Sequence, residues 1–408
     1  MNKIETVDIL IIGGGLTGIA LMLALAPLGY RVRLAEARAI TMLYHAPDIL
    51  ETRSIALSPA SIRILKQLFV WPALINAAAP IETIHISEQG RFGQAHFHAE
   101  AEKEPLGAVV EMHKLNHALK ARLDSADILA PASVTALDAT TGVANFKTNE
   151  GEKKIQATWV IAADGAHSSV RKLCHAEAEI KNYPEHAIAT NIALSRGHKS
   201  IAYERFTADG PLALLPLNGP NMALVWTLKH EQAALLKTKD KAEFLNALQH
   251  AFGYRAGRFL DVGPRETYPL QQIMMPKQVH QKVVFVGNAA HTLHPVAGQG
   301  LNLGLRDIAM LAECAAKYGL TDKALVQYQN LRKSDQIIIT TATDGLVSLF
   351  KSKLPGVGLA RRMGLVALDN SDFLKNMMLR HAKGFGGTVP DLVSGMPLDL
   401  NRLDEKVS

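Results

Sequence analysis

The stretch VDILIIGGGLTGIALMLALAPLGYRVRLAE, residues 7–36, decides the fold of this chain. Val7–Ile12 is apolar except for one aspartate and rich in β-branched residues, as expected of a strand buried on both faces of a parallel sheet. A helix is expected over residues 16–28, closed by a glycine, and a second strand over residues 31–35. This order predicts the opening βαβ unit of a dinucleotide-binding fold.

The turn after the first strand has the spacing Gly-x-Gly-x-x-Gly, at Gly13, Gly15 and Gly18. The glycines permit a tight turn and let backbone N–H groups approach a pyrophosphate, and the N-terminus of the following helix adds partial positive charge. Glu36 ends the second strand and is expected to accept hydrogen bonds from a ribose. The motif predicts a dinucleotide site but does not distinguish FAD from NAD.

Residues 7–28 are apolar enough to suggest a membrane span, but they contain Asp8, four glycines and Pro27, and no basic segment precedes them. A buried strand and helix explain this stretch better. We therefore expect a cytoplasmic protein without a transmembrane segment.

The composition is typical of a globular enzyme of one large or two medium domains, with 48% hydrophobic and 20% charged residues in 408. The two cysteines, Cys174 and Cys314, form no disulfide framework and no metal motif, which favours a reducing compartment. The net charge of +6 suggests anionic cofactors or surfaces, while the lack of basic runs interleaved with aromatics argues against nucleic acid.

Two further motifs decide between the dinucleotides. Residues 161–171 read IAADGAHSSVR, and residues 283–307 read VVFVGNAAHTLHPVAGQGLNLGLRD, each a strand that runs into a glycine turn. The three motifs, in this order and at these separations, resemble the class A flavoprotein monooxygenases, whose type member is p-hydroxybenzoate hydroxylase. The resemblance extends to about residue 385 and implies that the dinucleotide is FAD.

The resemblance also implies where the cofactor lies. Asp164 is expected near the FAD pyrophosphate and the path of the nicotinamide cofactor, and Asn288 near the ribityl chain. A helix that begins near Gly298 would favour negative charge at the N1/O2 edge of the reduced flavin. The expected FAD-binding residues are Gly13, Gly15, Gly18, Glu36, Arg53, Asp164, Gly165, Gly287, Asn288, Pro295, Gly298, Gln299, Gly300, Leu301 and Asn302.

Two of these residues have alternatives. Arg53 matches a family arginine near the flavin, but a charge on the approach to a helix explains it equally well. Asn288 stands where the family usually has aspartate; an amide both donates and accepts, so it can still hold a ribityl hydroxyl.

Three segments indicate which branch of the class A flavoprotein monooxygenases the chain resembles: ISEQG at 86–90, YERFTADGPLALLPL at 203–217 and GNAAHTLHP at 287–295. They look like the ubiquinone-biosynthesis hydroxylases, and most like the 2-polyprenyl-6-methoxyphenol hydroxylases. The resemblance implies that NAD(P)H reduces FAD, that O2 adds at flavin C4a as a hydroperoxide, and that the distal hydroxyl passes to the phenol ring. The expected product is 2-polyprenyl-6-methoxy-1,4-benzoquinol.

The expected fold is α/β, a Rossmann-like FAD-binding domain interleaved with an antiparallel-sheet substrate domain, as in p-hydroxybenzoate hydroxylase, followed by a helical C-terminal region. The FAD-binding parts are predicted at 1–80, 112–181 and 273–345, and the substrate parts at 81–111 and 182–272. Residues 346–408 are assigned to C-terminal helices and a tail, which is expected to lie loosely on the surface from Gly384.

Candidate catalytic residues are His294 and Pro295, in the flavin-facing segment, and Tyr203 and Arg205, on a strand of the substrate sheet. The alternative for the histidine is a hydrogen-bonded scaffold role, and for Tyr203 and Arg205 simple alternation with core residues. His85, His96 and His98 lack a ligand spacing and read as surface residues, so no metal site is predicted.

The stretch LVSLFKSKLPGVGLARRMGLVAL, residues 346–368, mixes apolar and basic residues. It suggests either peripheral contact with anionic lipid at the inner membrane or a core-packing helix pair with solvated charges. Other ubiquinone-biosynthesis proteins and a second copy of the chain are further partners left open. The alternative functions are a hydroxylase of another ring position or of a soluble aromatic acid and, from another class, a non-catalytic prenyl-binding protein.

Overall fold

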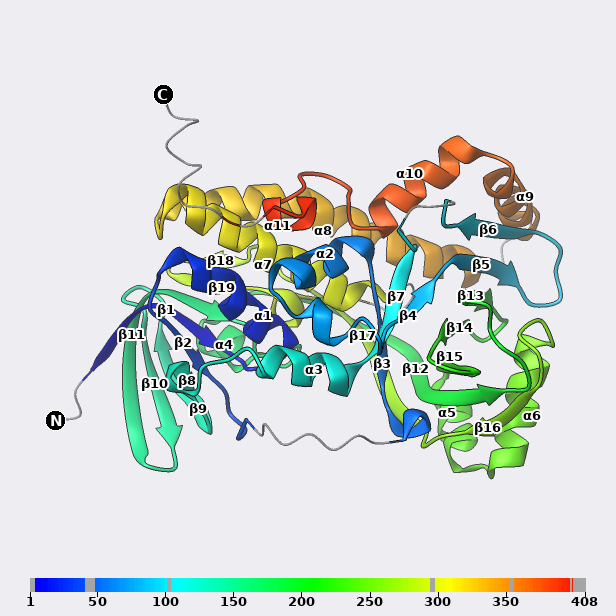
Figure 1. The fold of residues 1–408 in the computed structure, drawn as a ribbon, viewed down its shortest axis with the longest axis horizontal. Coiled ribbons are helices and arrows are strands. Elements are labelled where there is room, and N and C mark those ends of the chain that lie inside the picture. Colours follow the sequence, from blue (N-terminus) through cyan, green and yellow to red (C-terminus); the bar gives the residue numbers. More distant parts are fainter. Residues whose placement is uncertain are drawn as a thin grey trace.

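The computed structural model describes residues 4–40, 48–100, 104–293, 298–351, 356–396 and 398. Two large sheets lie side by side; the long helix α7 packs beside the first sheet, and the longer α8 runs along the molecule over both (Figure 1). The first sheet carries the glycine motifs. The second sheet contains the strands expected for a substrate domain. This arrangement confirms the predicted interleaved α/β fold.

The first sheet is centred on β1 (Glu5–Ile12), which pairs in parallel with β2 (Val32–Ala35) and β11 (Gly151–Ala162). Residues 9–11 of β1 are fully buried because helices cover one face and an apolar cluster covers the other, which explains the unbroken apolar run. The remaining strands are β8 (Ile128–Leu129), β9 (Ala132–Asp138), β10 (Val143–Thr148), β18 (Val279–His280) and β19 (Val283–Phe285).

Glycine turns convert strands of this sheet into helices. The helix after β1 is α1 (Leu16–Leu25), and a short 3₁₀ turn, η1 (Ala26–Leu28), completes the predicted length. Ser58 caps the start of α2, since its side chain accepts from Ser61 N–H. The other elements of this part are η2 (Ile49–Glu51), α2 (Pro59–Gln67), η3 (Trp71–Ala73), α3 (Met112–Lys120), η4 (Ser125–Asp127), α4 (Ser169–Leu173), η5 (Gly287–Ala289) and α7 (Gln299–Tyr318).

A small antiparallel sheet joins the two large ones. It consists of β3 (Ser54–Leu57), β7 (Gly107–Glu111) and β4 (Ala79–Ile81), with β7 in the middle. The predicted boundary at residue 81 therefore falls at the end of a strand of this sheet.

The second sheet has the order β20-β17-β12-β15-β14-β13-β5-β6 and is antiparallel except where β13 pairs in parallel with β5. Helices α5 (His230–Thr238) and α6 (Lys241–Phe252) cover its outer face, where Leu212, Leu214 and Trp226 are buried. Its strands are β5 (Thr83–Glu88), β6 (Gln94–His98), β12 (Glu179–Leu194), β13 (Ile201–Phe206), β14 (Pro211–Pro216), β15 (Asn221–Lys229), β16 (Phe259–Val262), β17 (Glu266–Met274) and β20 (His291–Thr292).

The opposite face of this sheet, here called the inner face, packs against apolar residues of the FAD-binding part and of the C-terminal helices. Its side chains belong to the residues that alternate with the outer-face residues along each strand. Along β14 the outer positions are fully covered, whereas Ala213 and Leu215 on the inner face are only partly buried. The inner face is therefore the more open of the two.

The C-terminal region is helical as predicted, with α8 (Asp322–Lys351), α9 (Val357–Asp369), α10 (Asp372–Ala382) and α11 (Asp391–Ser394). The prediction of a loose tail from residue 384 is wrong for α11. Leu392 and Val393 are buried in the core beside α2 and α7, and Asp391 N–H donates to Glu313. Burial of these two apolar side chains holds the segment down. Within the described residues, no helix has the length and apolar character needed to cross a membrane.

Candidate flavin and substrate site

The glycine turn after β1 leaves no room for side chains on its protein side. Gly13 has a φ of +116°, and a Cβ there would lie 2.4 Å from the carbonyl oxygen of Ala163. A Cβ on Gly18 would lie 1.9 Å from the oxygen of Gly13. Gly15, in contrast, faces open space and begins α1 without a side-chain cap, so its first-turn N–H groups are available to an anionic ligand.

Glu36 lies beside this turn, as the spacing predicts. Its carboxylate accepts from Gly14 N–H at 2.6 Å and from Arg38 N–H at 3.0 Å. These bonds fix the carboxylate next to the glycine turn, and its remaining lone pairs can accept from a ribose hydroxyl.

The second motif meets the first at the carboxyl end of β11. One oxygen of Asp164 accepts from the N–H groups of Ser169 and Val170 at 2.7 and 3.1 Å, while its other oxygen is buried without a hydrogen-bond partner among the described residues. Gly165, next to it, has a φ of +84° and faces open space. A buried carboxylate oxygen without a donor fits a ligand that brings one.

Arg171 joins the second motif to the third. Its guanidinium donates to the carbonyl of Ala289 at 2.9 Å and to that of Ala166 at 2.6 Å. The first and third motifs also touch, because a Cβ on Gly287 would lie 3.0 Å from Thr17, and Gly304 of α7 lies against Gly287. All three motifs therefore converge on one cradle.

Helix α7 points its N-terminus at this cradle. Its N-cap, Gly298, is left-handed with a φ of +59° and carries no side-chain cap, and Gly300 faces open space. The side chain of Asn302 bonds entirely within the protein, to Ser58, Ser61, Ala56 and Gly298. Asn302 therefore anchors the start of α7, and a contact with a cofactor would have to use its main chain.

A buried ionic cluster holds the third motif in place. Asp307 accepts from Arg332, Gln336 and the N–H of Gly287 at 2.8, 3.0 and 3.3 Å, and it contacts His291. Burial alone would raise the pKa of Asp307, but His291 and Arg332 outweigh it and hold that pKa well below its usual range. The carboxylate therefore stays charged and fixes the Gly287 turn.

Among the remaining predicted cofactor residues, Asn288 follows the Gly287 turn, Leu301 lies in the first turn of α7, and Arg53 precedes β3. Asn288 is exposed, and Leu301 packs partly against the core. Arg53 is exposed, 3.7 Å from Glu266 and 5.5 Å above the ring of Tyr268. His294 and Pro295 lie outside the described residues.

A small pocket, here called the junction pocket, lies where β3 meets the inner face. Arg53 and Met112 line it from the FAD-binding part, and Ala189, Val225 and Tyr268 from the second sheet. Burial raises the pKa of Tyr268, so the phenol stays neutral. Sequence reasoning missed Tyr268, because nothing in its neighbourhood on the chain marks it.

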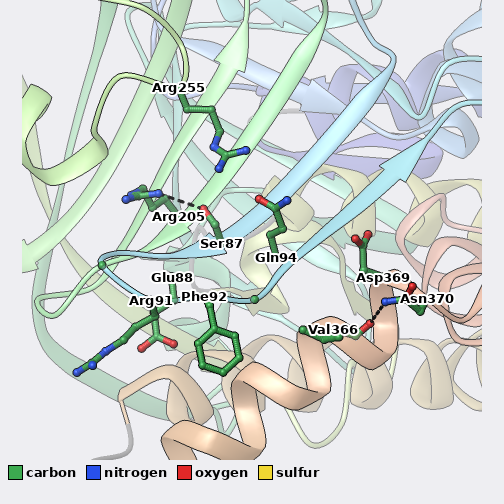
Figure 2. Close-up of a pocket in the computed structure, with 12 residues that line it drawn as sticks. Ser87, Glu88, Arg91, Phe92, Gln94, Arg205, Arg255, Val366, Asp369 and Asn370 are labelled. Carbon is green, nitrogen blue, oxygen red and sulfur yellow. Dashed lines mark hydrogen bonds between the residues drawn. The ribbon is translucent and has the colours of Figure 1, made fainter.

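Tyr203 and Arg205 do not reach this pocket. Both face outward on β13, where Tyr203 is buried 5.3 Å from the ring of Phe252 in the core under α6. Arg205 donates to the carbonyl of Ala251 and to Ser87 and lines a separate pocket of about 530 Å³ (Figure 2). The structure therefore contradicts a catalytic role for both, because strand alternation turns them away from the FAD-binding part.

The histidine trio gives a second correction. His85 is not a surface residue; it is buried, and burial lowers its pKa to about 4. Its ring lies 4.7 Å from that of His96 and 3.2 Å from Gln94. Across the described ranges, no group of three or more His, Cys, Asp or Glu side chains could hold a metal ion.

The similarity of this chain to known proteins supports the assignment of the cradle to FAD. Residues 6–332 match the family described as FAD binding domain. The chain is 35% identical to the ubiquinone hydroxylase UbiL of Rhodospirillum rubrum, over 97% of this chain and 94% of that one. It is 31% identical to the 3-demethoxyubiquinol 3-hydroxylase of Escherichia coli, over 93% of this chain and 99% of that one.

Solved structures show the same fold. The p-nitrophenol 4-monooxygenase PnpA of Pseudomonas putida superposes with a TM-score of 0.74 at 19% identity, over 94% of this chain and 99% of that one. The cradle fits FAD, since it offers two uncapped helix N-termini and an unpaired buried acceptor. The chain belongs to the FAD-binding-domain family, in the branch that contains the ubiquinone hydroxylases, and is an FAD-dependent aromatic-ring monooxygenase that uses NAD(P)H and O2.

Proposed function

We propose that this enzyme hydroxylates a prenylated phenol in ubiquinone biosynthesis, converting 2-polyprenyl-6-methoxyphenol to 2-polyprenyl-6-methoxy-1,4-benzoquinol. The observation that carries the proposal is the half-open, apolar inner face beside the junction pocket. An isoprenoid tail needs such a surface, since each buried CH2 contributes about 0.8 kcal/mol. The names of two relatives that are more than 30% identical support the pathway.

The chain's own residues would hold the cofactor at the cradle. The α1 N-terminus would meet the pyrophosphate, and the free oxygen of Asp164 would accept from a hydroxyl of the cofactor beside it. Glu36 would accept from a ribose hydroxyl, and Asn288 would bind the ribityl chain. The α7 N-terminus would face the ring system. Bound FAD supplies the redox chemistry and the activation of O2, and the protein supplies orientation, electrostatics and a dry cavity.

Two alternatives within the enzyme class differ in substrate. The Escherichia coli relative is named for hydroxylation at position 3 of a demethoxyubiquinol. The first alternative is therefore hydroxylation of another ring position of a quinone precursor. A soluble aromatic acid is disfavoured, because the exposed Arg53 is the one cation among the residues that line the junction pocket, and Glu266 pairs with it. A non-catalytic prenyl-binding protein is disfavoured by the complete cradle.

The deciding experiment is NAD(P)H oxidation by the FAD-loaded protein, with and without 2-prenyl-6-methoxyphenol, with products analysed by mass. Substrate-stimulated oxidation and the gain of one oxygen at the position para to the phenol would support the proposal. Stimulation by another precursor alone would move the reaction to that ring position.

We also propose peripheral contact with anionic lipid through α9 and α10, the route by which a membrane-dissolved phenol would enter. These helices expose Met363, Phe373 and Met377 at 55, 77 and 50%. Helix α9 lines the pocket of Figure 2 through Val366 and Asp369. In that pocket Arg91 and Arg255 make no ion pair with any described residue. The combination of apolar and basic groups is typical of surfaces that bind anionic bilayers. Other ubiquinone-biosynthesis proteins and a second copy of the chain remain proposed partners, to be tested by size-exclusion chromatography and pull-down.

A further inference from the structure

The pocket of Figure 2, here called the arginine pocket, has a volume of about 530 Å³, a size typical of small-molecule sites. The turn between β5 and β6, the side chain of Arg205 on β13, the loop that follows α6 and helix α9 surround it. None of its lining residues belongs to the FAD cradle or to the junction pocket. The proposed hydroxylation therefore makes no use of this cavity.

Positive charge is concentrated in the arginine pocket, on Arg91, Arg205 and Arg255. Arg205 is held in place, since its guanidinium donates to the carbonyl of Ala251 at 3.3 Å and to the hydroxyl of Ser87 at 3.4 Å. The side chains of Arg91 and Arg255 make no hydrogen bond or ion pair with any residue that the structure describes. Burial lowers the pKa of Arg205, and so does the neighbouring charge of Arg255. The two guanidinium groups therefore repel each other, and an anion bound between them would remove this repulsion.

The carboxylates that line the pocket do not neutralise these arginines, because each is paired elsewhere. Glu88 accepts from Arg361 at 3.1 Å, and Arg361 does not line the cavity. Asp369 accepts from the backbone N–H of His96 at 2.7 Å and lies 3.5 Å from the ammonium of Lys375. The cavity therefore keeps an excess of positive charge, which attracts anions.

Neutral polar groups complete the lining and favour an anion that carries hydroxyl groups. Gln94 uses its side-chain oxygen on the ring of His85, 3.2 Å away, so its N–H groups remain to donate. Asn370 donates to the carbonyl of Val366 at 2.8 Å, so its side-chain oxygen remains to accept (Figure 2). Guanidinium groups bind phosphate through paired hydrogen bonds, because their planar fork matches two phosphate oxygens. These groups together suit a phosphate ester of a polyol such as glycerol.

Exposed apolar side chains border the pocket, and they distinguish a lipid phosphate from a soluble one. Phe92, on the turn between β5 and β6, lines the pocket and is 56% exposed, and Val366 of α9 lines it and is also exposed. Met363 lies one helical turn before Val366 and continues this apolar surface along α9. A Cβ on Gly93 would lie 3.0 Å from the carbonyl oxygen of Arg362, so the turn packs directly on α9 and keeps Phe92 beside the helix. A phospholipid needs such a border, because its acyl chains begin where the charged headgroup ends.

We propose that the arginine pocket binds the headgroup of an anionic phospholipid of the phosphatidylglycerol type, with the phosphate between Arg205 and Arg255. Arg91 would add a third cation, the glycerol would reach Asn370, and the acyl chains would leave over Phe92 and α9. The inference rests on the proposed lipid contact and deepens it, since it names the lipid class and the residues that recognise it.

A fitted site predicts a preference that a basic surface does not. A basic surface attracts anionic lipids according to their charge, whereas a fitted site discriminates between headgroups of equal charge. Phosphatidylserine should bind less well than phosphatidylglycerol, because its ammonium group would lie against the arginines.

The test measures co-sedimentation of the FAD-loaded full chain with phosphatidylcholine vesicles that contain phosphatidylglycerol or, at the same mole fraction, phosphatidylserine. Arg255→Gln removes a side chain without a hydrogen bond or ion pair in the described fold, so the variant should keep the melting temperature of the wild type. We expect it to weaken binding to phosphatidylglycerol about tenfold and to abolish the preference over phosphatidylserine. Arg258→Gln removes the same charge from an exposed arginine of the same loop that does not line the pocket, and it should match the wild type. Inorganic phosphate, titrated calorimetrically into the wild type and Arg255→Gln, tests a soluble source of the phosphate.

The outcomes separate this site from the broader lipid contact. If the wild type binds phosphatidylglycerol vesicles and Arg255→Gln binds them equally well, the headgroup site is overturned while the contact through α9 and α10 stands. Equal binding of the wild type to both anionic lipids would also overturn the site, because charge alone would explain it. Binding of inorganic phosphate that depends on Arg255, without binding to vesicles, would overturn the lipid as the ligand. If the wild type binds neither vesicles nor phosphate, both lipid proposals fall, whereas the hydroxylation, measured on detergent-dispersed phenol, is tested independently.

Discussion

At the scale of single residues, glycines and carboxylates shape the proposed cofactor cradle. Gly13 and Gly18 are required because backbone atoms approach them closely, whereas Gly15 is open towards the cradle. Asp164 has an unpaired buried oxygen beside the cofactor cradle, and Glu204, on the inner face of β13, has a pKa that burial raises to about 7. Substitutions at these glycines and at Glu204 test their roles separately.

Gly15→Ala and Gly18→Ala should separate cofactor binding from folding. A methyl group on Gly15 meets no protein atom within 4 Å, so the apoprotein should keep its melting temperature while the methyl group obstructs the ligand and FAD affinity falls at least tenfold. A methyl group on Gly18 collides with Gly13, so Gly18→Ala should lower both. Differential scanning fluorimetry and flavin fluorescence measure the two quantities; equal FAD affinity in Gly15→Ala and wild type would contradict the assigned cradle.

Glu204→Gln should stabilise the protein at alkaline pH. The folded pKa of Glu204, about 7, lies above the ordinary value of 4.5. The carboxyl therefore costs nothing below pH 4.5, costs progressively more stability as the pH rises towards 7, and imposes its full cost above that. We expect the variant to gain about 2 kcal/mol at pH 8 and almost nothing at pH 4.5. Urea unfolding at the two pH values checks this, and a gain that is equal at both would exclude the raised pKa.

At the scale of elements, α7 organises the site. Asn302 ties its first turn to β3 and α2, and Asp307, one and a half turns on, holds the Gly287 turn and Arg332 of α8. The helix therefore positions its own uncapped N-terminus relative to the rest of the cradle. The buried charges on α7 serve this positioning, since a buried ion pair adds little net stability while the loss of one partner is costly.

Asp307→Asn should destabilise the FAD-binding part by about 3–5 kcal/mol, because Arg332 and His291 would lose their charged partner in a buried site. The folded pKa of Asp307 is depressed, so its contribution is complete above the ordinary aspartate pKa and disappears as the pH falls below it. The wild type should therefore exceed the variant at pH 7, with the difference shrinking towards pH 3. Thermal unfolding measures this, with the exposed Glu231→Gln on α5 as the control.

At the scale of the whole molecule, the second sheet separates two environments. Its outer face forms a closed core with α5 and α6, while its inner face stays partly open towards the FAD-binding part. Helix α9 lies beside β6, away from the first sheet, and α10 packs against α9 (Figure 1). The proposed bilayer contact at α9–α10 therefore lies away from the first sheet and its cofactor cradle.

Replacing Met363 and Phe373 together by serine should weaken binding to phosphatidylglycerol vesicles at least fivefold, with FAD binding unchanged. The reason is the loss of two exposed apolar side chains from the proposed contact surface. Leu235→Ser on α5 exposes a comparable side chain elsewhere and should bind like the wild type. Co-sedimentation at low and high salt measures the effect, and equal binding by the double variant would remove the membrane contact.

The sequence by itself determined the fold class and the three glycine turns, and the resemblance that these motifs carry implied FAD as the cofactor. These features depend on local requirements: glycines at fixed spacing, strands that end in turns, and helices that begin at them. Tertiary structure decided which strand residues face the site. Tyr203 and Glu204 are adjacent on one strand, and only the pairing and packing of the second sheet place Tyr203 in the core under α6 and Glu204 on the inner face. Burial raises the pKa of Glu204, and this burial depends on residues distant in the chain. No local sequence pattern could therefore predict the raised pKa.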